Sequence, residues 1–512
     1  STPLKRVRLG IPFVVTRNRS SQVMDVATLK EEWTKAGQGH VFRFWDELSV
    51  EQKEELYKQL KSIDVSTVKR VHEKLSKQGV EEAKKADVVV KPLPKVVTQD
   101  QLNETEKARL THLGYEEICA GHVAVLLLAG GQGTRLGCND PKGMYDVGLP
   151  SHKTLFQLQA ERLLLVQRLA AHACGVSDPS TVVIPWYIMT SFITDTPTQK
   201  YFAEHNYFGL KSDQIYFFNQ DLFPCVQENG LILMQSKYEI SIAPNGNGGL
   251  WSALYSSGAL DDMERRGATV VASYGVDNVL ARVADPLFIG FTKFHNTPIA
   301  CKAVSKATPD ERVGVLCLKD DKPSVIEYSE ISPEQAHEID PATGTLRFNA
   351  AHIILNNFTV EFIKKVVHPD SNLLSKLPYH IAKKKIPCIN EHGSPTEVTG
   401  WKFELFVFDV FEFADELSAI EVVRADEFSP LKNSIESKTD NPITCRQHLS
   451  SLHQKWVINA GGHIERDPTP TEGEEPLFEI DANLSFAGEG LEALVKGKTF
   501  TLPYYLQATN SN

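Results

Sequence analysis

The N-terminal part of the chain is polar, and its apolar residues recur at helical spacing. Within residues 25–110, Leu56 and Leu60 belong to one such apolar stripe. Ser49 and Gln52, just ahead of it, have the residue types and the spacing of a capping box. This pattern predicts a helical N-terminal domain at 25–110.

A different pattern follows, in which continuous apolar runs alternate with amphipathic stretches. Val123–Ala129 holds seven apolar residues without alternation, which is typical of a strand covered on both faces. The other segments that carry the pattern are three predicted strands and one predicted helix: 182–189, 215–218, 269–274 and 156–169. The alternation predicts a Rossmann-like, doubly wound α/β domain at 111–400 with a mostly parallel central sheet. Residues 401–512 are assigned to a smaller α+β C-terminal domain.

Two segments fall outside this periodic pattern. Residues 1–24 contain basic side chains and no acidic ones. They could be a disordered tail, a targeting segment, a regulatory arm or residues left from expression. Residues 91–95, with Pro92 and Pro94, are predicted to form a linker.

Composition narrows the class of protein. With 42% hydrophobic and 23% charged residues in 512, the chain has ordinary globular values, and no apolar run reaches the roughly 18 residues of a membrane-spanning helix. Eight scattered cysteines without Cys-x-x-Cys spacing argue against a zinc site or a disulfide framework. A net charge of −11 without a broad basic face argues against nucleic acid as a partner. We therefore expect a cytoplasmic protein, with organellar targeting by the basic N-terminus as the alternative.

A glycine-rich loop follows the first apolar strand. Gly130, Gly131 and Gly133 lack Cβ atoms, so their backbone N–H groups can approach an anion closely. Arg135 adds a guanidinium fork that matches two phosphate oxygens. Lys142 follows between a proline and a glycine and adds a second cation. Together these residues predict a phosphate-binding loop, although an ordinary strand-to-helix turn remains the alternative for the loop alone.

Neither of two common phosphate loops matches this sequence. A Walker A loop closes with Gly-Lys-Ser/Thr, whereas this loop continues Gly-Thr-Arg-Leu-Gly. The frame that begins at Gly131 comes close to a dinucleotide fingerprint but has Leu136 where the third glycine belongs. An NAD-dependent oxidoreductase is therefore a weak alternative.

Two further segments lie where ligands bind in such sheets, beyond the carboxyl ends of strands. The run 245–249 is flexible enough to contact a base or a ribose, and its alternative is a plain turn. Asp277 follows the strand predicted at 269–274, where a carboxylate can hold Mg²⁺ against phosphates. A helix cap is the alternative role for Asp277.

These motifs together resemble a known family. Leu-Ala-Gly-Gly-Gln-Gly-Thr-Arg-Leu-Gly at 128–137, followed by Pro-Lys-Gly-Met at 141–144, resembles the eukaryotic UDP-N-acetylglucosamine pyrophosphorylases, relatives of the UDP-sugar pyrophosphorylases. Further motifs occur in the family's order at 185–191, 243–249, 276–278, 325–331, 406–409 and 427–433. The resemblance covers roughly residues 25 to 490.

The resemblance implies a nucleotidyltransferase fold and roles for individual residues. Uracil and ribose binding fall to Gly130, Gly131, Gln220, Gly246 and Asn247. The catalytic cations are Arg135, Lys142, Lys432 and Lys402. The metal, Mg²⁺ or Mn²⁺, is assigned to Asp277. Sugar recognition is assigned to Glu327, Tyr328, Asn349, His352, Phe406 and Phe408.

Two positions depart from the family's pattern. His352 stands where many relatives have the final asparagine of Phe-Asn-Ala-Gly-Asn-Ile, a residue that contacts the sugar. A histidine is bulkier than an asparagine and titrates near neutrality, so the preference between gluco and galacto sugars stays open, as does a purely structural role. Asn245 replaces the aspartate of Pro-Asp-Gly-Asn-Gly-Gly and removes a negative charge from that loop.

The reaction that the resemblance implies joins UTP and N-acetylglucosamine 1-phosphate. The sugar phosphate attacks the α-phosphorus of UTP in line, which gives UDP-N-acetylglucosamine and pyrophosphate and requires a divalent metal. The alternatives are a UDP-glucose or broad-specificity UDP-sugar pyrophosphorylase and, from another class, a non-catalytic UDP-sugar-binding regulatory protein. We expect no membrane partner and a monomer or weak homo-oligomer.

Overall fold

The computed structural model describes residues 25–81, 89–466 and 475–507, so the basic segment 1–24 lies outside the described residues. The chain divides into two compact units, which are described separately. Unit 1 consists of Ser1–Asp87, Gln220–Gly249 and Leu377–Phe406, and unit 2 consists of Val88–Asn219, Leu250–Lys376 and Val407–Asn512.

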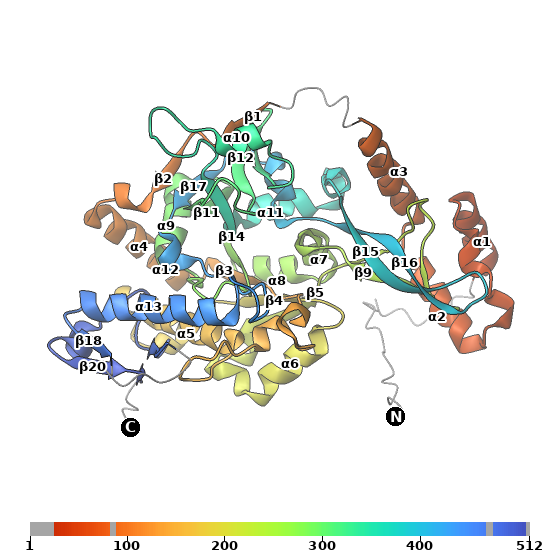
Figure 1. The fold of residues 1–512 in the computed structure, drawn as a ribbon. Helices are drawn as coiled ribbons and strands as arrows, with labels where there is room; N and C mark the ends of the chain where they lie inside the picture. The colour runs from red at the N-terminus through yellow and green to blue at the C-terminus, as the bar shows by residue number, and fades with distance from the viewer. Residues whose placement is uncertain (1–24, 82–88, 467–474, 508–512) are drawn as a thin grey trace. The chain divides into compact units, whose positions relative to one another are not determined.

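Unit 1 combines helices with a long β-ribbon (Figure 1). Its helices are α1 (Val26–Lys35), α2 (Val50–Lys61) and α3 (Val65–Glu81). Its strands are β6 (Leu222–Pro224), β7 (Met234–Ser236), β8 (Glu239–Ile240), β9 (Ile242–Pro244), β15 (His380–Ile389) and β16 (Pro395–Glu404). The ribbon is the antiparallel pair β15–β16, and β6 pairs with β9 in the same sense.

Local sequence signals explain how α2 begins and how it packs. The predicted capping box is confirmed, because Ser49 accepts from the backbone N–H of Gln52, whose side chain accepts from the N–H of Ser49. The predicted stripe is confirmed as well: Leu56 and Leu60 are fully buried in a core that also contains Trp401 of β16. The ribbon and the N-terminal helices therefore form one hydrophobic core.

Unit 2 is built on an eleven-stranded mixed sheet. Its strands in the described residues are β1 (Val90–Pro92), β2 (Val96–Thr98), β3 (Val123–Leu128), β4 (Trp186–Thr190), β5 (Ile215–Asn219), β10 (Val270–Gly275), β11 (Ile299–Ser305), β12 (Val315–Lys319), β13 (Lys322–Ile326), β14 (Ala350–Thr359) and β17 (Ser418–Glu421). The main path runs β2-β17-β11-β14-β10-β3-β4-β5, in which β14 alone is antiparallel to its two neighbours. The predicted mostly parallel sheet is confirmed.

Unit 2 has helices on both faces of this sheet. Its helices are α4 (Glu104–Cys119), α5 (Leu155–Ala173), α6 (Asp195–Glu204), α7 (Leu250–Ser256), α8 (Ala259–Arg265), α9 (Pro286–His295), α10 (Pro333–His337), α11 (Val360–Val367), α12 (Arg424–Glu427), α13 (Pro442–Asn459) and α14 (Glu492–Val495). Of these, α13 and α14 pack in a separate core with β19 (Phe478–Ile480) and β20 (Thr499–Leu502). Val125 of β3 packs with α5 on one face, while Tyr187 of β4 donates to Asp262 of α8 on the other. This two-sided cover explains why β3 is continuously apolar.

The predicted domain boundaries do not coincide with the limits of these units. Residues 91 and 92 of the predicted linker belong to β1, which pairs with β12. The strand β2 begins directly after the predicted linker and pairs with β17. The predicted boundary at 400/401 falls inside β16. Within unit 2, the last part of the chain adds two short parallel pairs, β18 (His463–Arg466) with β20 (Thr499–Leu502) and β19 (Phe478–Ile480) with β21 (Tyr504–Leu506). No described helix has the length and apolar character needed to cross a membrane.

Candidate functional site

The glycine loop folds back on itself at the carboxyl end of β3. The N–H of Gly133 donates to Asp140 O at 2.9 Å, and the N–H of Lys142 donates to Gly131 O at 3.1 Å. A Cβ on Gly133 would lie 2.3 Å from Sγ of Cys138, so a larger residue here would require that side chain to move. Arg135 is exposed in the short 3₁₀ turn Thr134–Leu136. The loop therefore holds Lys142 beside Gly131.

Lys142 meets the predicted metal carboxylate. Its Nζ lies 3.9 Å from Oδ2 of Asp277 and donates to the backbone carbonyl of Leu431 at 3.2 Å. Asp277 follows β10, which pairs in parallel with β3, so the two predicted groups lie beyond the carboxyl ends of adjacent strands. The N–H of Leu431 donates to the backbone carbonyl of Asp277 at 2.8 Å. The structure thus brings Lys142 and Asp277 together with the residue that precedes Lys432.

A carboxylate that the sequence did not single out lies in the same region. The backbone carbonyl of Asp440 accepts from the N–H groups of Lys432 at 2.8 Å and Asn433 at 2.9 Å. Burial raises the pKa of Asp440, and the positive charge of Lys432 opposes that rise, while Asp277 adds to it. Asp440 therefore shares an electrostatic environment with Asp277 and Lys432. The fold of the loop after Lys432 brings Asp440 there, so the sequence alone could not identify it.

Two of the predicted sugar-binding residues of unit 2, His352 and Glu327, lie next to Gly314. The N–H of His352, in β14, donates to Gly314 O at 2.9 Å, and a Cβ on Gly314 would lie 2.9 Å from Oε1 of Glu327. Tyr328 is 49% exposed beside Glu327. The side chain of Asn349 is held at the end of β11, where its amide donates to Oγ of Ser305 at 3.1 Å.

His352 is a buried, neutral imidazole. Its Nε2 donates to Oδ1 of Asn356 at 2.8 Å, and its ring meets Phe408 and Phe411 edge-on at centroid distances of 5.7 and 5.6 Å. Burial lowers the pKa of His352 to about 4, against which the bond to Asn356 acts. The expected titration near neutrality is therefore wrong for the folded protein.

Gly130 directly precedes Gly131 in unit 2, and five other predicted residues belong to unit 1. Gly246 has a φ of +83°, and a Cβ there would lie 2.4 Å from Leu405 O. The N–H of Leu405 donates to Asn245 O at 2.7 Å, next to Gly246, and Asn247 follows half-buried. The other three members are Gln220, which is buried directly before β6, Lys402 of β16, and Phe406, whose ring stacks on His380 at 4.3 Å. The two predicted aromatic residues, Phe406 and Phe408, thus belong to different units.

The residues around Asp277 suit a metal that arrives with its phosphates. Among the described residues no group of three or more His, Cys, Asp or Glu side chains could hold a metal ion. Mg²⁺ in nucleotide sites uses one or two carboxylates and takes its other ligands from phosphate oxygens and water. Asp277 fits that arrangement.

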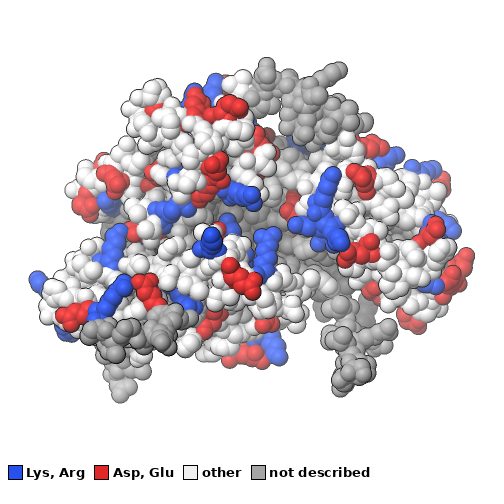
Figure 2. Space-filling view, in the orientation of Figure 1, with Lys and Arg blue, Asp and Glu red and all other residues white. Residues whose placement is uncertain are grey.

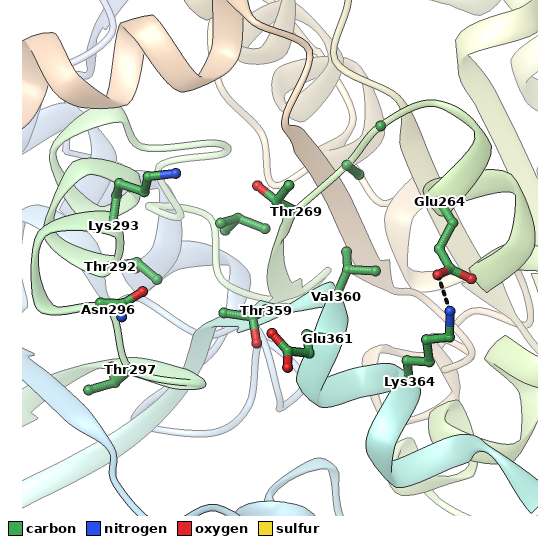
Figure 3. Close-up of a pocket in the computed structure, with 13 residues that line it drawn as sticks. Glu264, Thr269, Thr292, Lys293, Asn296, Thr297, Thr359, Val360, Glu361 and Lys364 are labelled. Atoms are coloured by element: carbon green, nitrogen blue, oxygen red, sulfur yellow. Dashed lines mark hydrogen bonds and ion pairs between the residues drawn. The ribbon is translucent and has the colours of Figure 1, made fainter.

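A separate cavity lies at the other end of the strands of the same sheet, where β10 begins and β14 ends (Figure 3). Its volume is about 570 Å³, and Val270 at the start of β10 and Thr359 at the end of β14 lie in its wall. Glu264 and Lys364 close one side as an ion pair at 2.6 Å. None of the predicted site residues lines it. Figure 2 shows positive and negative side chains interspersed on the face in view.

Comparison with known proteins places the chain in a family. The model of the UTP–glucose-1-phosphate uridylyltransferase family matches residues 66–489. The chain belongs to this family. A member from Dictyostelium discoideum named probable UDP-N-acetylglucosamine pyrophosphorylase is 41% identical over 492 residues, which are 94% of this chain and 98% of that protein.

Two further members of the family are similar over most of their length. The human UDP-N-acetylhexosamine pyrophosphorylase-like protein 1 is 41% identical, with 92% of this chain and 95% of that protein covered. The crystal structure of the uridine diphosphate N-acetylglucosamine pyrophosphorylase from Trypanosoma brucei has a TM-score of 0.77 at 31% identity and covers 93% of this chain and 95% of that one. The resemblance that the motifs indicated is confirmed.

Proposed function

We propose that the chain transfers the uridylyl group of UTP to N-acetylglucosamine 1-phosphate, which gives UDP-N-acetylglucosamine and pyrophosphate. The observation that carries this proposal is the convergence of Lys142 and Asp277 with the segment of Lys432 at the carboxyl ends of β3 and β10. Family membership and similarity to full-length relatives named for N-acetyl sugars support it.

The proposed reaction requires the protein to position the two substrates and to neutralise the negative charge of their phosphates. The attacking sugar phosphate is already an anion, so no covalent enzyme intermediate is needed, and the protein has to align two polyanions in line. In this proposal Arg135 and Lys142 bind the phosphates of UTP, and Lys432 binds the sugar phosphate. Lys402 is a further cation. The two polyanions repel each other, and these cations offset that repulsion. They also attract the negative charge that develops on the departing pyrophosphate, which lowers the barrier.

Asp277 would hold Mg²⁺, or Mn²⁺ in its place. When bound, the ion neutralises phosphate charge and polarises the bonds around the α-phosphorus. The glycines Gly130, Gly131 and Gly246, with Gln220 and Asn247, are proposed to bind uracil and ribose through backbone and amide groups. These nucleotide-binding assignments follow the family resemblance.

Recognition of the N-acetyl sugar is proposed for Glu327, Tyr328, Asn349, His352, Phe406 and Phe408. The neutral imidazole of His352 already donates from Nε2 to Asn356, so only Nδ1 is left for a ligand, and Nδ1 is then an acceptor. An asparagine at this position offers both a donor and an acceptor. We therefore propose that His352 accepts a hydrogen bond from a sugar hydroxyl.

The experiment measures pyrophosphate release with UTP, Mg²⁺ and one of three acceptors: N-acetylglucosamine 1-phosphate, N-acetylgalactosamine 1-phosphate or glucose 1-phosphate. We expect kcat/KM for an N-acetylated acceptor to exceed that for glucose 1-phosphate by at least about tenfold, since one well-packed group contributes roughly 1–3 kcal/mol. A preference for glucose 1-phosphate would establish the function in the family's name, and no release with any acceptor would leave a non-catalytic UDP-sugar-binding protein. A cytoplasmic location and a monomeric or weakly oligomeric state stay predictions.

A further inference from the structure

Two short segments of unit 2 meet beneath the proposed phosphate site. One follows β10 and carries Asp277, and the other precedes Lys432. They run antiparallel as an isolated bridge between Asn278 and Pro430, which the bond from the N–H of Val279 to Ser429 O extends. The spacing between a metal carboxylate and a phosphate-binding amine therefore depends on how firmly these segments are joined.

The side chain of Asn278 joins them. Its Nδ2 donates to the backbone carbonyl of Glu427 at 2.7 Å, and its Oδ1 accepts from the N–H of Ser429 at 2.9 Å and from that of Leu280 at 3.2 Å. Asn278 is 3% exposed, and Glu427 and Ser429 are 1% and 2% exposed. Because water cannot replace these bonds at such burial, the amide reinforces the backbone bonds that already join the two segments, from Leu431 N–H to Asp277 O and from Val279 N–H to Ser429 O.

The partner segment is itself anchored to the sheet. The carboxylate of Glu427 is ion-paired to the buried amine of Lys302 in β11 and lies 3.4 Å from a guanidinium nitrogen of Arg282. Lys302 also pairs with Asp285, the N-cap of α9. Two cations and two anions balance here away from water, and such a group holds its geometry because breaking one pair leaves an uncompensated buried charge.

We propose that Asn278 is a positioning residue that sets the distance between Asp277 and Lys432. It acts through the backbone and touches no reacting atom. The position of Lys142 depends on the same distance, because its amine contacts Leu431 O of one segment and Oδ2 of Asp277 of the other. This inference rests on the proposed function, in which Asp277 holds the metal and Lys432 the sugar phosphate.

The test is a double-mutant cycle between Asn278→Ser and Lys432→Ala. A serine at 278 can still accept from the N–H of Leu280, but it is too short to bridge to Glu427 and Ser429. We expect the serine variant to lower kcat by about 10- to 100-fold, as misplacement of catalytic groups by about 1 Å does. In the Lys432→Ala background, where the positioned amine is gone, the same change should cost less than about threefold. The apparent Mg²⁺ activation constant of the single variant should rise.

The matched control is Asn357→Ala in β14. Asn357 is 1% exposed, and its amide donates to Phe288 O and to Oγ1 of Thr292, away from the site. This control should lower the melting temperature and leave kcat and the Mg²⁺ dependence unchanged. If the serine variant at 278 does not fold, the cycle uses Asn278→Thr, which adds no charge, keeps a hydroxyl acceptor for the N–H of Leu280 and fills more of the vacated volume than serine does.

An equal kcat loss from Asn278→Ser in both backgrounds would overturn the positioning role, because independent effects multiply. The single variants Asp277→Ala and Lys432→Ala separate this failure from failure of the proposed function. Wild-type turnover in both would refute the roles given to Asp277 and Lys432, whereas the absence of pyrophosphate release by the wild-type protein with every acceptor would refute the proposed function itself. Reduced turnover in both, together with an additive cycle, would refute only the role of Asn278.

Discussion

A single methyl group added to Gly143 should disable the turn that carries Lys142. Gly143 is buried in the 3₁₀ turn Lys142–Met144, and a Cβ there would lie 2.2 Å from Cζ of Phe156 and 2.4 Å from both Cε atoms. The ring is fully buried and packs edge-on against Phe202 at 5.1 Å, so it has little room to withdraw. The turn must therefore move.

The size of the movement follows from the contact distances. Opening the gap from 2.2 Å to the 3.4 Å of an ordinary contact requires a shift of about 1.2 Å. Lys142 is the neighbouring residue of the same turn, so its amine should move by a similar amount. A misplacement of about 1 Å costs on the order of 10²-fold in rate, and overpacking costs about 1–3 kcal/mol of stability.

The assay for Gly143→Ala is pyrophosphate release at saturating substrates, with thermal unfolding measured in parallel. Phe156→Leu supplies the internal control, because a leucine side chain ends short of the colliding ring atoms. We expect the double variant to recover at least tenfold of the lost turnover, even though Phe156→Leu alone lowers stability by opening a cavity. Wild-type turnover in Gly143→Ala, or no recovery in the double variant, would refute this reasoning.

Three further outcomes are expected. Arg135→Ala, Lys142→Ala and Lys432→Ala should each lower kcat by about 10²–10³-fold with melting temperatures close to wild type, and near-normal turnover would remove that residue from the mechanism. Activity should disappear in a chelator and return with Mg²⁺, and Asp277→Asn should raise the Mg²⁺ activation constant; full activity in the chelator would contradict the role of Asp277. Burial lowers the pKa of His352 to about 4, below the roughly 6.5 of the unfolded chain, so the unfolded chain binds the proton first and stability falls as pH drops from about 6.5 to about 4, by roughly 3 kcal/mol. In His352→Asn, the melting temperature should fall less than in the wild type as the pH drops from about 6.5 to about 4. If the melting temperatures of the variant and the wild type fall in parallel with pH, another group is responsible.

Elements whose signals are local could be predicted from the sequence. The buried strand at 123–128 and the capping box of Ser49 depend on neighbouring residues and appear in the structure as expected. The composition of the units depends on long-range pairing, and no local pattern reports that Leu377–Phe406 joins the N-terminal helices. The three-residue strands β1 and β2 were missed because two prolines and a short apolar run also suit a linker.

The candidate site divides in the same way. Lys142 and Asp277 were predicted from loops that follow strands, and the parallel pairing of those strands brings them together. The link made by Asn278 could not be predicted, since its partners lie about 150 residues away along the chain. His352 was recognised as a departure, but its neutral state depends on burial between Phe408 and Phe411, which only the fold reveals.

The most direct test of the central claim is a crystal structure of the complex with UDP-N-acetylglucosamine and Mg²⁺. The account predicts that the amines of Lys142 and Lys432 lie within about 3.5 Å of the diphosphate oxygens and that Asp277 is a ligand of the metal. A diphosphate bound beyond the reach of both amines, or a metal held without Asp277, would contradict it.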